Sequence, residues 1–239
     1  MAQRFYCLRS CRRTYAAGLA VPLPRLAAES GKPETADNGA REPFRFSGLL
    51  LVILFCILLE GMLREGITTW MPSFISESFH LSNVISILTG VILPLFTIFM
   101  YNLTGVIYEK AVPNAIRLSA LLFLAAAGVM TCAMTSSAAL SAVLAAVIVG
   151  SMHGISLLMT CMVPPVFACH GKVSFISGLL NASTYAGSAL SSCGIAFFAE
   201  RFGWSSTVYL WSFIALAGAL LCFSITRKWA AFTAGSTDA

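Results

Sequence analysis

Three charged side chains, Glu60, Arg64 and Glu65, lie within an apolar stretch that otherwise carries no charge from Ser47 to Ser76. A charged side chain at the centre of a membrane-spanning helix costs about 2.5–3.5 kcal/mol, so such residues usually face the interior of a helix bundle or a water-filled path. The planar guanidinium of an arginine can donate two parallel hydrogen bonds to a carboxylate or a phosphate. We therefore regard Arg64 as the first candidate for binding an anion.

The two carboxylates near Arg64 occupy different faces of a helix. Glu60 lies four residues before Arg64 and shares its face, whereas Glu65 is turned about 100° away. Two interpretations of the Glu60–Arg64 pair stay open. Either the pair orients its helix against a neighbour, or the carboxylate or phosphate of a substrate competes with Glu60 for the guanidinium. A further hypothesis is that Glu60 or Glu65 takes up a proton as a coupling step.

The elements that position these residues are predicted to be membrane-spanning helices. Of the 239 residues, 58% are hydrophobic and only 10% are charged, and the mean hydropathy is +0.83. A typical soluble domain has about 25% charged residues. A helix needs roughly 20 mostly apolar residues to cross a bilayer. The predicted spans are residues 47–74, 82–108, 115–135, 138–164, 173–199 and 204–226.

The hydropathy pattern divides the chain into three parts. Residues 1–45 are predicted to form a disordered basic cytoplasmic tail, residues 46–228 a bundle of six transmembrane helices, and residues 229–239 a cytoplasmic C-terminal tail. The breaks between spans are short, so sequential helices should pack antiparallel. The expected class is an all-α integral membrane protein in contact with the lipid bilayer.

The Lys and Arg residues close to the span ends predict the orientation of the bundle. One side carries Lys32, Arg41, Arg45, Lys110, Arg117, Lys172, Arg227 and Lys228. The opposite side carries only Arg201. Both termini are therefore predicted to be cytoplasmic, which requires an even number of spans and agrees with six. We expect a multi-pass protein of the plasma membrane.

The segment that contains Arg64 is similar to a known family motif. Residues 63–74 read L-R-x-G-I-x-x-W-x-P-x-F. This pattern resembles the first helix of the second half of the organophosphate:phosphate antiporters, a family of the major facilitator superfamily. The resemblance implies that Arg64 occupies the position of an arginine that helps to bind phosphate at the centre of the transporter. Glu60 and Glu65 depart from the family pattern, which has aromatic or neutral residues there.

Two later segments extend the resemblance over about residues 45–228. Gly105, Glu109 and Lys110 fit the second-half copy of the superfamily's loop signature G-x-x-x-(D/E)-(R/K), although its later glycine and basic pair are missing. Residues 164–204 resemble the stretch from the tenth to the twelfth helix. The resemblance implies the C-terminal six-helix half of a major facilitator fold. It also implies secondary antiport of a small organic anion, including phosphorylated ones, by alternating access.

Small residues recur on two adjacent faces of the fifth predicted span, where they favour close helix packing. One face has Gly178, Ala182 and Ala186, and the other has Ser183, Gly187 and Ser191. The alternative is that polar residues of this span, Asn181, Thr184 and Tyr185, line the cavity as they do in related transporters. Gly150 and Gly154 form a similar packing face on the fourth span, where we expect His153 to donate or accept a hydrogen bond between helices. The candidate substrate-binding residues are thus Arg64, Glu60, Glu65, Asn181 and Tyr185.

Transporters of this superfamily are built from two six-span halves, and the chain supplies one of them. Three hypotheses follow: a truncated product, a half-transporter that pairs with a separate N-terminal six-helix half or with a second copy, or a six-span sensing or structural protein that has lost transport. We rank them in that order.

Other classes of function find no support in the motifs. The sequence has no H-E-x-x-H, no G-x-S-x-G and no Walker-type loop, so we expect no enzyme and no cofactor, and a solute or ion gradient as the driving force. The sequence contains no basic patch with interleaved aromatic residues, so it does not predict nucleic-acid binding. Five cysteines lie within predicted spans, where cysteine packs as a small apolar residue. We expect no metal site and no structural disulfide.

Overall fold

The computed structural model describes residues 48–80, 92–133 and 137–235, and these residues form helices without any strand. The predicted N-terminal tail, residues 1–45, lies outside the described residues. The elements in chain order are α3 (Gly48–Phe79), α5 (Ile92–Lys110), α6 (Ala115–Ala133), α7 (Ala138–Leu157), the π-helical turn η1 (Leu158–Met162), the 3₁₀ helix η2 (Pro164–His170) and α8 (Val173–Gly235). The prediction of an all-helical chain is confirmed for this part of it.

The prediction of six separate spans is matched only in part, because the described residues form five α-helices. Helix α8 covers both the fifth and the sixth predicted span. It is interrupted at Gly203, whose φ of 78° and ψ of 170° lie outside the helical region and suit only glycine. Gly203 divides α8 into a first segment, residues 173–202, and a second segment, residues 204–235. The second segment continues through residues 229–235, which the sequence had assigned to a tail.

Three helical stretches are long and apolar enough to cross a membrane: Ala115–Cys132, Ala138–Ala168 and Val173–Ala234. They indicate a membrane protein. Helix α3 has 32 residues, enough to cross, but it carries Glu60, Arg64 and Glu65 within its length. It also continues to Phe79, five residues past the predicted end at residue 74, so Glu77 is helical rather than part of a break.

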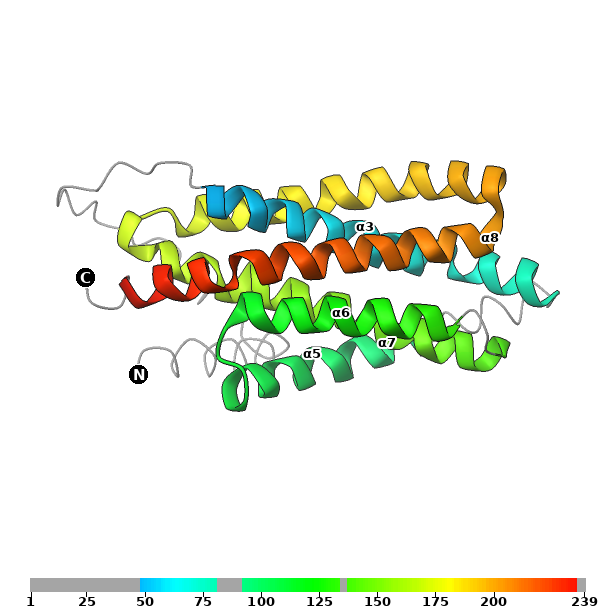
Figure 1. Ribbon diagram of the computed structural model, residues 1–239, viewed down its shortest axis with the longest axis horizontal. Helices are drawn as coiled ribbons and strands as arrows, with labels where there is room; N and C mark the ends of the chain where they lie inside the picture. The colour runs from blue at the N-terminus through cyan, green and yellow to red at the C-terminus, as the bar shows by residue number, and fades with distance from the viewer. Residues whose placement is uncertain (1–47, 81–91, 134–136, 236–239) are drawn as a thin grey trace, which may run out of the picture. The chain divides into compact units, whose positions relative to one another are not determined.

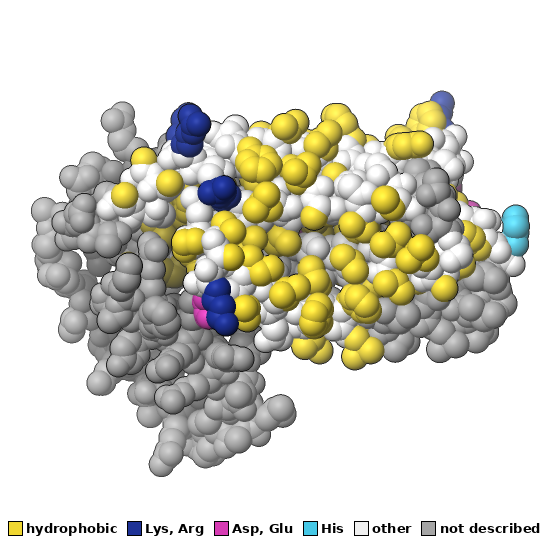
Figure 2. All heavy atoms as spheres, turned by 60° about the horizontal axis from the view of Figure 1, so that its bottom comes forward, with side chains coloured by type: hydrophobic (Ala, Val, Ile, Leu, Met, Phe, Trp, Pro, Cys, Tyr) yellow, Lys and Arg dark blue, Asp and Glu magenta, His cyan; other side chains and the backbone are white. Residues whose placement is uncertain are grey.

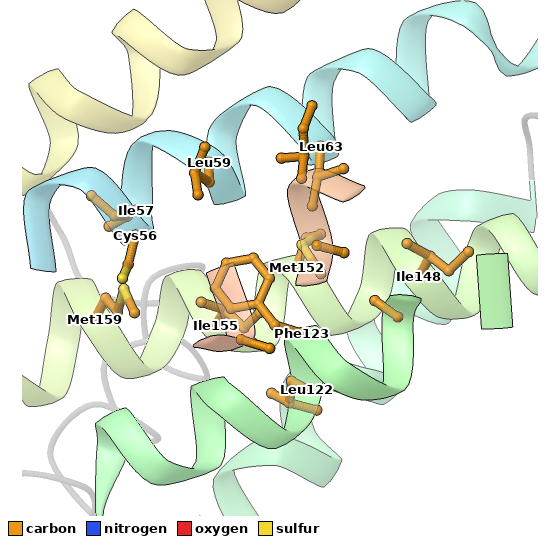
Figure 3. Close-up of a cluster of buried hydrophobic side chains, with 14 of the residues drawn as sticks. Cys56, Ile57, Leu59, Leu63, Leu122, Phe123, Ile148, Met152, Ile155 and Met159 are labelled. Atoms are coloured by element: carbon orange, nitrogen blue, oxygen red, sulfur yellow. The ribbon is translucent and has the colours of Figure 1, made fainter. Parts of the chain in front are cut away.

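The helices pack side by side along a common direction (Figure 1). Helix α3 lies along α8 and also contacts α7, while α6 packs on α8 and α7, and α5 packs on α7. The core between α3, α6 and α7 is filled by apolar side chains that include Leu63, Phe123 and Met152, each fully buried (Figure 3). Trp211 of α8 is also buried.

Glycines allow the closest approach between α3 and the first segment of α8. A Cβ atom on Gly61 would overlap the carbonyl oxygen of Thr184, and one on Gly187 would overlap the carbonyl oxygen of Leu58. Gly178, on the other predicted packing face, has no atom within 4 Å of an added Cβ. The face of Gly187 and Ser191 therefore packs on α3, and the face of Gly178 does not.

The outer surface of the bundle suits a lipid environment. Large apolar side chains such as Phe99, Leu124, Phe197 and Phe213 are exposed. On the face drawn in Figure 2, charged side chains gather toward the two ends and the middle is apolar or uncharged. This distribution agrees with a bundle whose central zone contacts hydrocarbon.

A cysteine pair gives a test of this packing. The side chains of Cys56 in α3 and Cys222 in α8 lie close to each other where the two helices pack, and both are buried. In a chain whose other cysteines are serine, we expect a lipid-soluble oxidant such as copper phenanthroline to cross-link them. Cleavage between the two positions, followed by electrophoresis without reductant, would show the linked fragments. Replacing Cys222 by Ser is the control, and no cross-link in the parent chain would contradict this packing of α3 on α8.

Candidate functional site

Glu60 and Arg64 form an ion pair within α3. The Nη1 atom of Arg64 is 3.7 Å from Oε1 of Glu60, and the side chains are 19% and 0% exposed, respectively. Neither carboxylate oxygen of Glu60 has a hydrogen-bond partner among the described residues. The pair predicted from the spacing is confirmed. It joins a fully buried carboxylate to a guanidinium that still reaches the surface.

Glu65 has a different environment on the same helix. Its Oε1 accepts a hydrogen bond of 3.0 Å from the hydroxyl of Thr69, and its side chain is half-buried. Thr68 is exposed and donates to the carbonyl oxygen of Arg64 over 2.7 Å. Glu65 is thus satisfied locally and makes no ion pair with Arg64.

Helix α7, which packs on α3, carries a row of polar side chains that begins at His153. Nδ1 of His153 is 2.9 Å from the carbonyl oxygen of Val149, in its own helix, so the expectation of a hydrogen bond between helices is wrong for this nitrogen. Ser156 and Thr160 continue the row, and Thr160 donates to the Ser156 carbonyl oxygen over 2.6 Å.

The first segment of α8 carries another row of polar side chains, in addition to those of α3 and α7. Asn181 and Tyr185 are exposed, Tyr185 by 70%. Ser188 shares their side of the helix by its spacing of three from Tyr185, and its hydroxyl donates to the carbonyl oxygen of Gly61 in α3 over 3.4 Å. The Asn181 amide donates to Ser177 of its own helix over 3.1 Å.

These contacts place polar residues of α7 and α8 next to the part of α3 that carries Arg64. In the described chain no hydrogen bond joins Asn181 or Tyr185 to Arg64, so they share a surface with it rather than a closed pocket. We call this surface the open polar face. It comprises Arg64, Glu65 and Thr68 of α3, His153, Ser156 and Thr160 of α7 and η1, and Asn181, Tyr185 and Ser188 of α8.

The loop-motif residues Gly105, Glu109 and Lys110 lie apart from this face. Glu109 and Lys110 are exposed at the end of α5, and Lys110 lies in its last turn, where a positive charge favours the helix dipole. Gly105 has open space around it. The described structure gives these residues no contact with the Arg64 region.

A small cavity lies deeper in the bundle. It has a volume of about 20 Å³ and is lined by apolar residues that include Ile67, Met71, Phe74 and Trp211. That volume holds about one water molecule. An organic anion does not fit there, so the open polar face is the better candidate for binding a solute.

Sequence reasoning missed Ser156, Thr160 and Ser188. The hydroxyls of Ser156 and Thr160, four residues apart on α7 and its continuation, are a detectable signal for one polar row. The contact of Ser188 with Gly61 spans 127 residues and has no local signal. Among the described residues, no group of three or more His, Cys, Asp or Glu side chains is placed to hold a metal ion.

Comparison of the chain with protein-family models, with curated proteins and with solved structures finds no match. The open polar face is therefore the feature of the molecule that indicates a function.

Proposed function

We propose that this chain is one six-helix half of a secondary transporter of the major facilitator type, and that it binds a small anionic solute at Arg64. The observation that carries the proposal is the state of the Arg64 guanidinium. Its one ion pair is long, at 3.7 Å, and the side chain remains 19% exposed on the open polar face. Of the other Lys and Arg residues of the described chain, four lie near helix ends or breaks, Lys110, Arg117, Lys172 and Arg201, and the remaining two, Arg227 and Lys228, are exposed in the last part of α8.

The geometry favours an anion over a neutral solute. A guanidinium has five N–H donors in a rigid fork, and the Glu60 contact, at 3.7 Å, is longer than a hydrogen bond. A phosphate or carboxylate that approaches from the open polar face would offer two oxygens to this fork. Glu60 cannot follow Arg64 to the surface because its side chain is fully buried. The solute would therefore compete directly with the pair.

The open polar face also indicates that a second protein or a second copy of the chain packs against this one. Polar side chains in the hydrocarbon zone face protein or a water-filled cavity rather than lipid. Arg64, Tyr185 and Asn181 would thus be covered by a separate N-terminal six-helix half or by a second copy of the chain. We place the assembly in the plasma membrane, with the ends that carry most Lys and Arg on the cytoplasmic side.

A second candidate function is a six-span sensing or structural protein that no longer transports. The Glu60–Arg64 ion pair favours this second function, because the two charges neutralise each other without any solute. In that case Arg64 only neutralises Glu60 and positions α3, and the chain has no affinity for anions.

Anion binding by the purified full chain separates these candidates. In lipid nanodiscs, we expect inorganic phosphate to bind saturably, with a Kd in the range of about 1 μM to 1 mM that is typical for small substrates. Isothermal titration calorimetry would measure it, with a neutral sugar at the same concentration as the control. Heat that does not saturate with phosphate would favour the sensing or structural protein.

A further inference from the structure

The least satisfied ionisable group in the described chain is the carboxylate of Glu60. Its side chain is 0% exposed, and neither oxygen accepts a hydrogen bond. Its one favourable contact is the Arg64 guanidinium, 3.7 Å from Oε1. Buried carboxylates are ordinarily paired and hydrogen-bonded. The negative charge of Glu60 therefore depends on Arg64 alone.

The surroundings of Glu60 offer no substitute for Arg64. On α3, Glu65 accepts a hydrogen bond from Thr69, and Cys56 lies beside the Cys222 thiol of α8. On α7, His153 is the titratable side chain of the open polar face, and its Nδ1 contacts the carbonyl oxygen of Val149. The α8 residues that contact Gly61 are Thr184 and Ser188, neither of which titrates, and the hydroxyl of Thr184 donates to its own helix.

We propose that Glu60 is a proton-binding site coupled to anion binding: when an anion draws the Arg64 guanidinium toward the open polar face, the Glu60 carboxylate takes up one proton. This inference rests on the proposed anion binding at Arg64. Without its partner, a charged Glu60 would remain buried and uncompensated, which is strongly unfavourable. Protonation removes the charge in place and requires no movement of the buried side chain.

The charges balance in this step. In the proposed starting state Glu60 is an anion that is paired with the Arg64 cation at the 3.7 Å contact. After binding, Glu60 is a neutral carboxylic acid and Arg64 is paired with the solute anion. The proton comes from the bulk solution, from hydronium or a buffer acid, so one proton enters with each anion and a monoanion adds no net charge. A proton gradient could then drive the solute in the direction in which protons flow.

Proton uptake by the full chain in nanodiscs tests the inference. Inorganic phosphate is added at pH 7 in weakly buffered solution, and a pH-sensitive dye reports the protons taken up. Phosphate exchanges protons of its own, so the informative quantity is the difference between variants. We expect wild type to take up about one proton more per bound phosphate than Glu60→Gln. We also expect its affinity to rise about tenfold for each unit of falling pH relative to that variant. Glu77→Gln, on the same helix but outside the open polar face, should behave as wild type.

The outcomes are distinguishable. Phosphate binding with equal proton uptake by wild type and Glu60→Gln would overturn the proton site and leave anion binding intact. If wild type binds no phosphate, both the anion site at Arg64 and the proton site at Glu60 are rejected. If Glu60→Gln does not fold, infrared difference spectra of wild type decide: the absorption of a protonated carboxylic acid should appear on phosphate binding, and its absence would reject the inference.

Discussion

Replacing Arg64 by Lys is expected to weaken phosphate binding by about 10- to 150-fold. Lysine keeps the positive charge next to Glu60 but loses the planar fork that holds two oxygens at once. A hydrogen bond to a charged group contributes about 1.5–3 kcal/mol, which corresponds to this range of affinity. The measurement is titration calorimetry of the purified chain with inorganic phosphate. Lysine is preferable to alanine, because alanine would leave the buried Glu60 without a counter-charge and would destabilise the bundle.

Arg201→Lys is the matched control for this experiment. Arg201 is exposed near the break in α8 at Gly203 and takes no part in the open polar face. We expect that variant to bind phosphate as wild type does, and both variants to insert and elute normally. Unchanged affinity in Arg64→Lys would show that the guanidinium fork does not hold the anion.

Replacing Gly187 by Leu is expected to break the contact between α3 and the first segment of α8. Even the Cβ atom of the new side chain would overlap the carbonyl oxygen of Leu58. A backbone atom cannot move aside as a flexible side chain does, so the two helices must separate. Overpacking in a well-packed core costs about 1–3 kcal/mol, and backbone overlap places this variant at or above that upper value. Thermal denaturation followed by fluorescence-detected size-exclusion chromatography would show a lower Tm or an aggregated chain.

Gly178→Leu provides the comparison on the same helix. Gly178 is exposed and has no atom within 4 Å of an added Cβ. Leucine also has a helix propensity better than that of glycine by up to about 1 kcal/mol, so this variant should be as stable as wild type or slightly more stable. Equal stability of the two leucine variants would contradict the close contact at Gly187.

Local sequence patterns predicted the helical class. The apolar runs located α6 and α7 closely. Helix ends were less predictable, because capping and tertiary contacts decide them. The Nε1 atom of Trp204 donates to Glu77 over 2.7 Å, so a contact with α8 accompanies the continuation of α3 to Phe79. Hydropathy placed a break between residues 199 and 204, and the structure narrows that break to the single residue Gly203.

The site was predictable where it depends on one helix and unpredictable where it depends on two. The spacing of four residues was sufficient to pair Glu60 with Arg64. It could not choose between the small-residue faces of Gly178 and Gly187, since both have the same periodicity and only the position of α3 distinguishes them. The placement of Tyr185 on an exposed face next to α3 likewise depends on tertiary packing.

Because Glu60 and Arg64 are on the same helix, their pairing has a consequence for biosynthesis. During translation α3 is made before α5, α6, α7 and α8, so none of the later helices can neutralise its charges when it leaves the ribosome. The ion pair between residues four apart forms as soon as this turn of α3 is helical. If α3 enters a bilayer, as we propose, it therefore brings the counter-charge of Glu60 with it before the rest of the bundle exists.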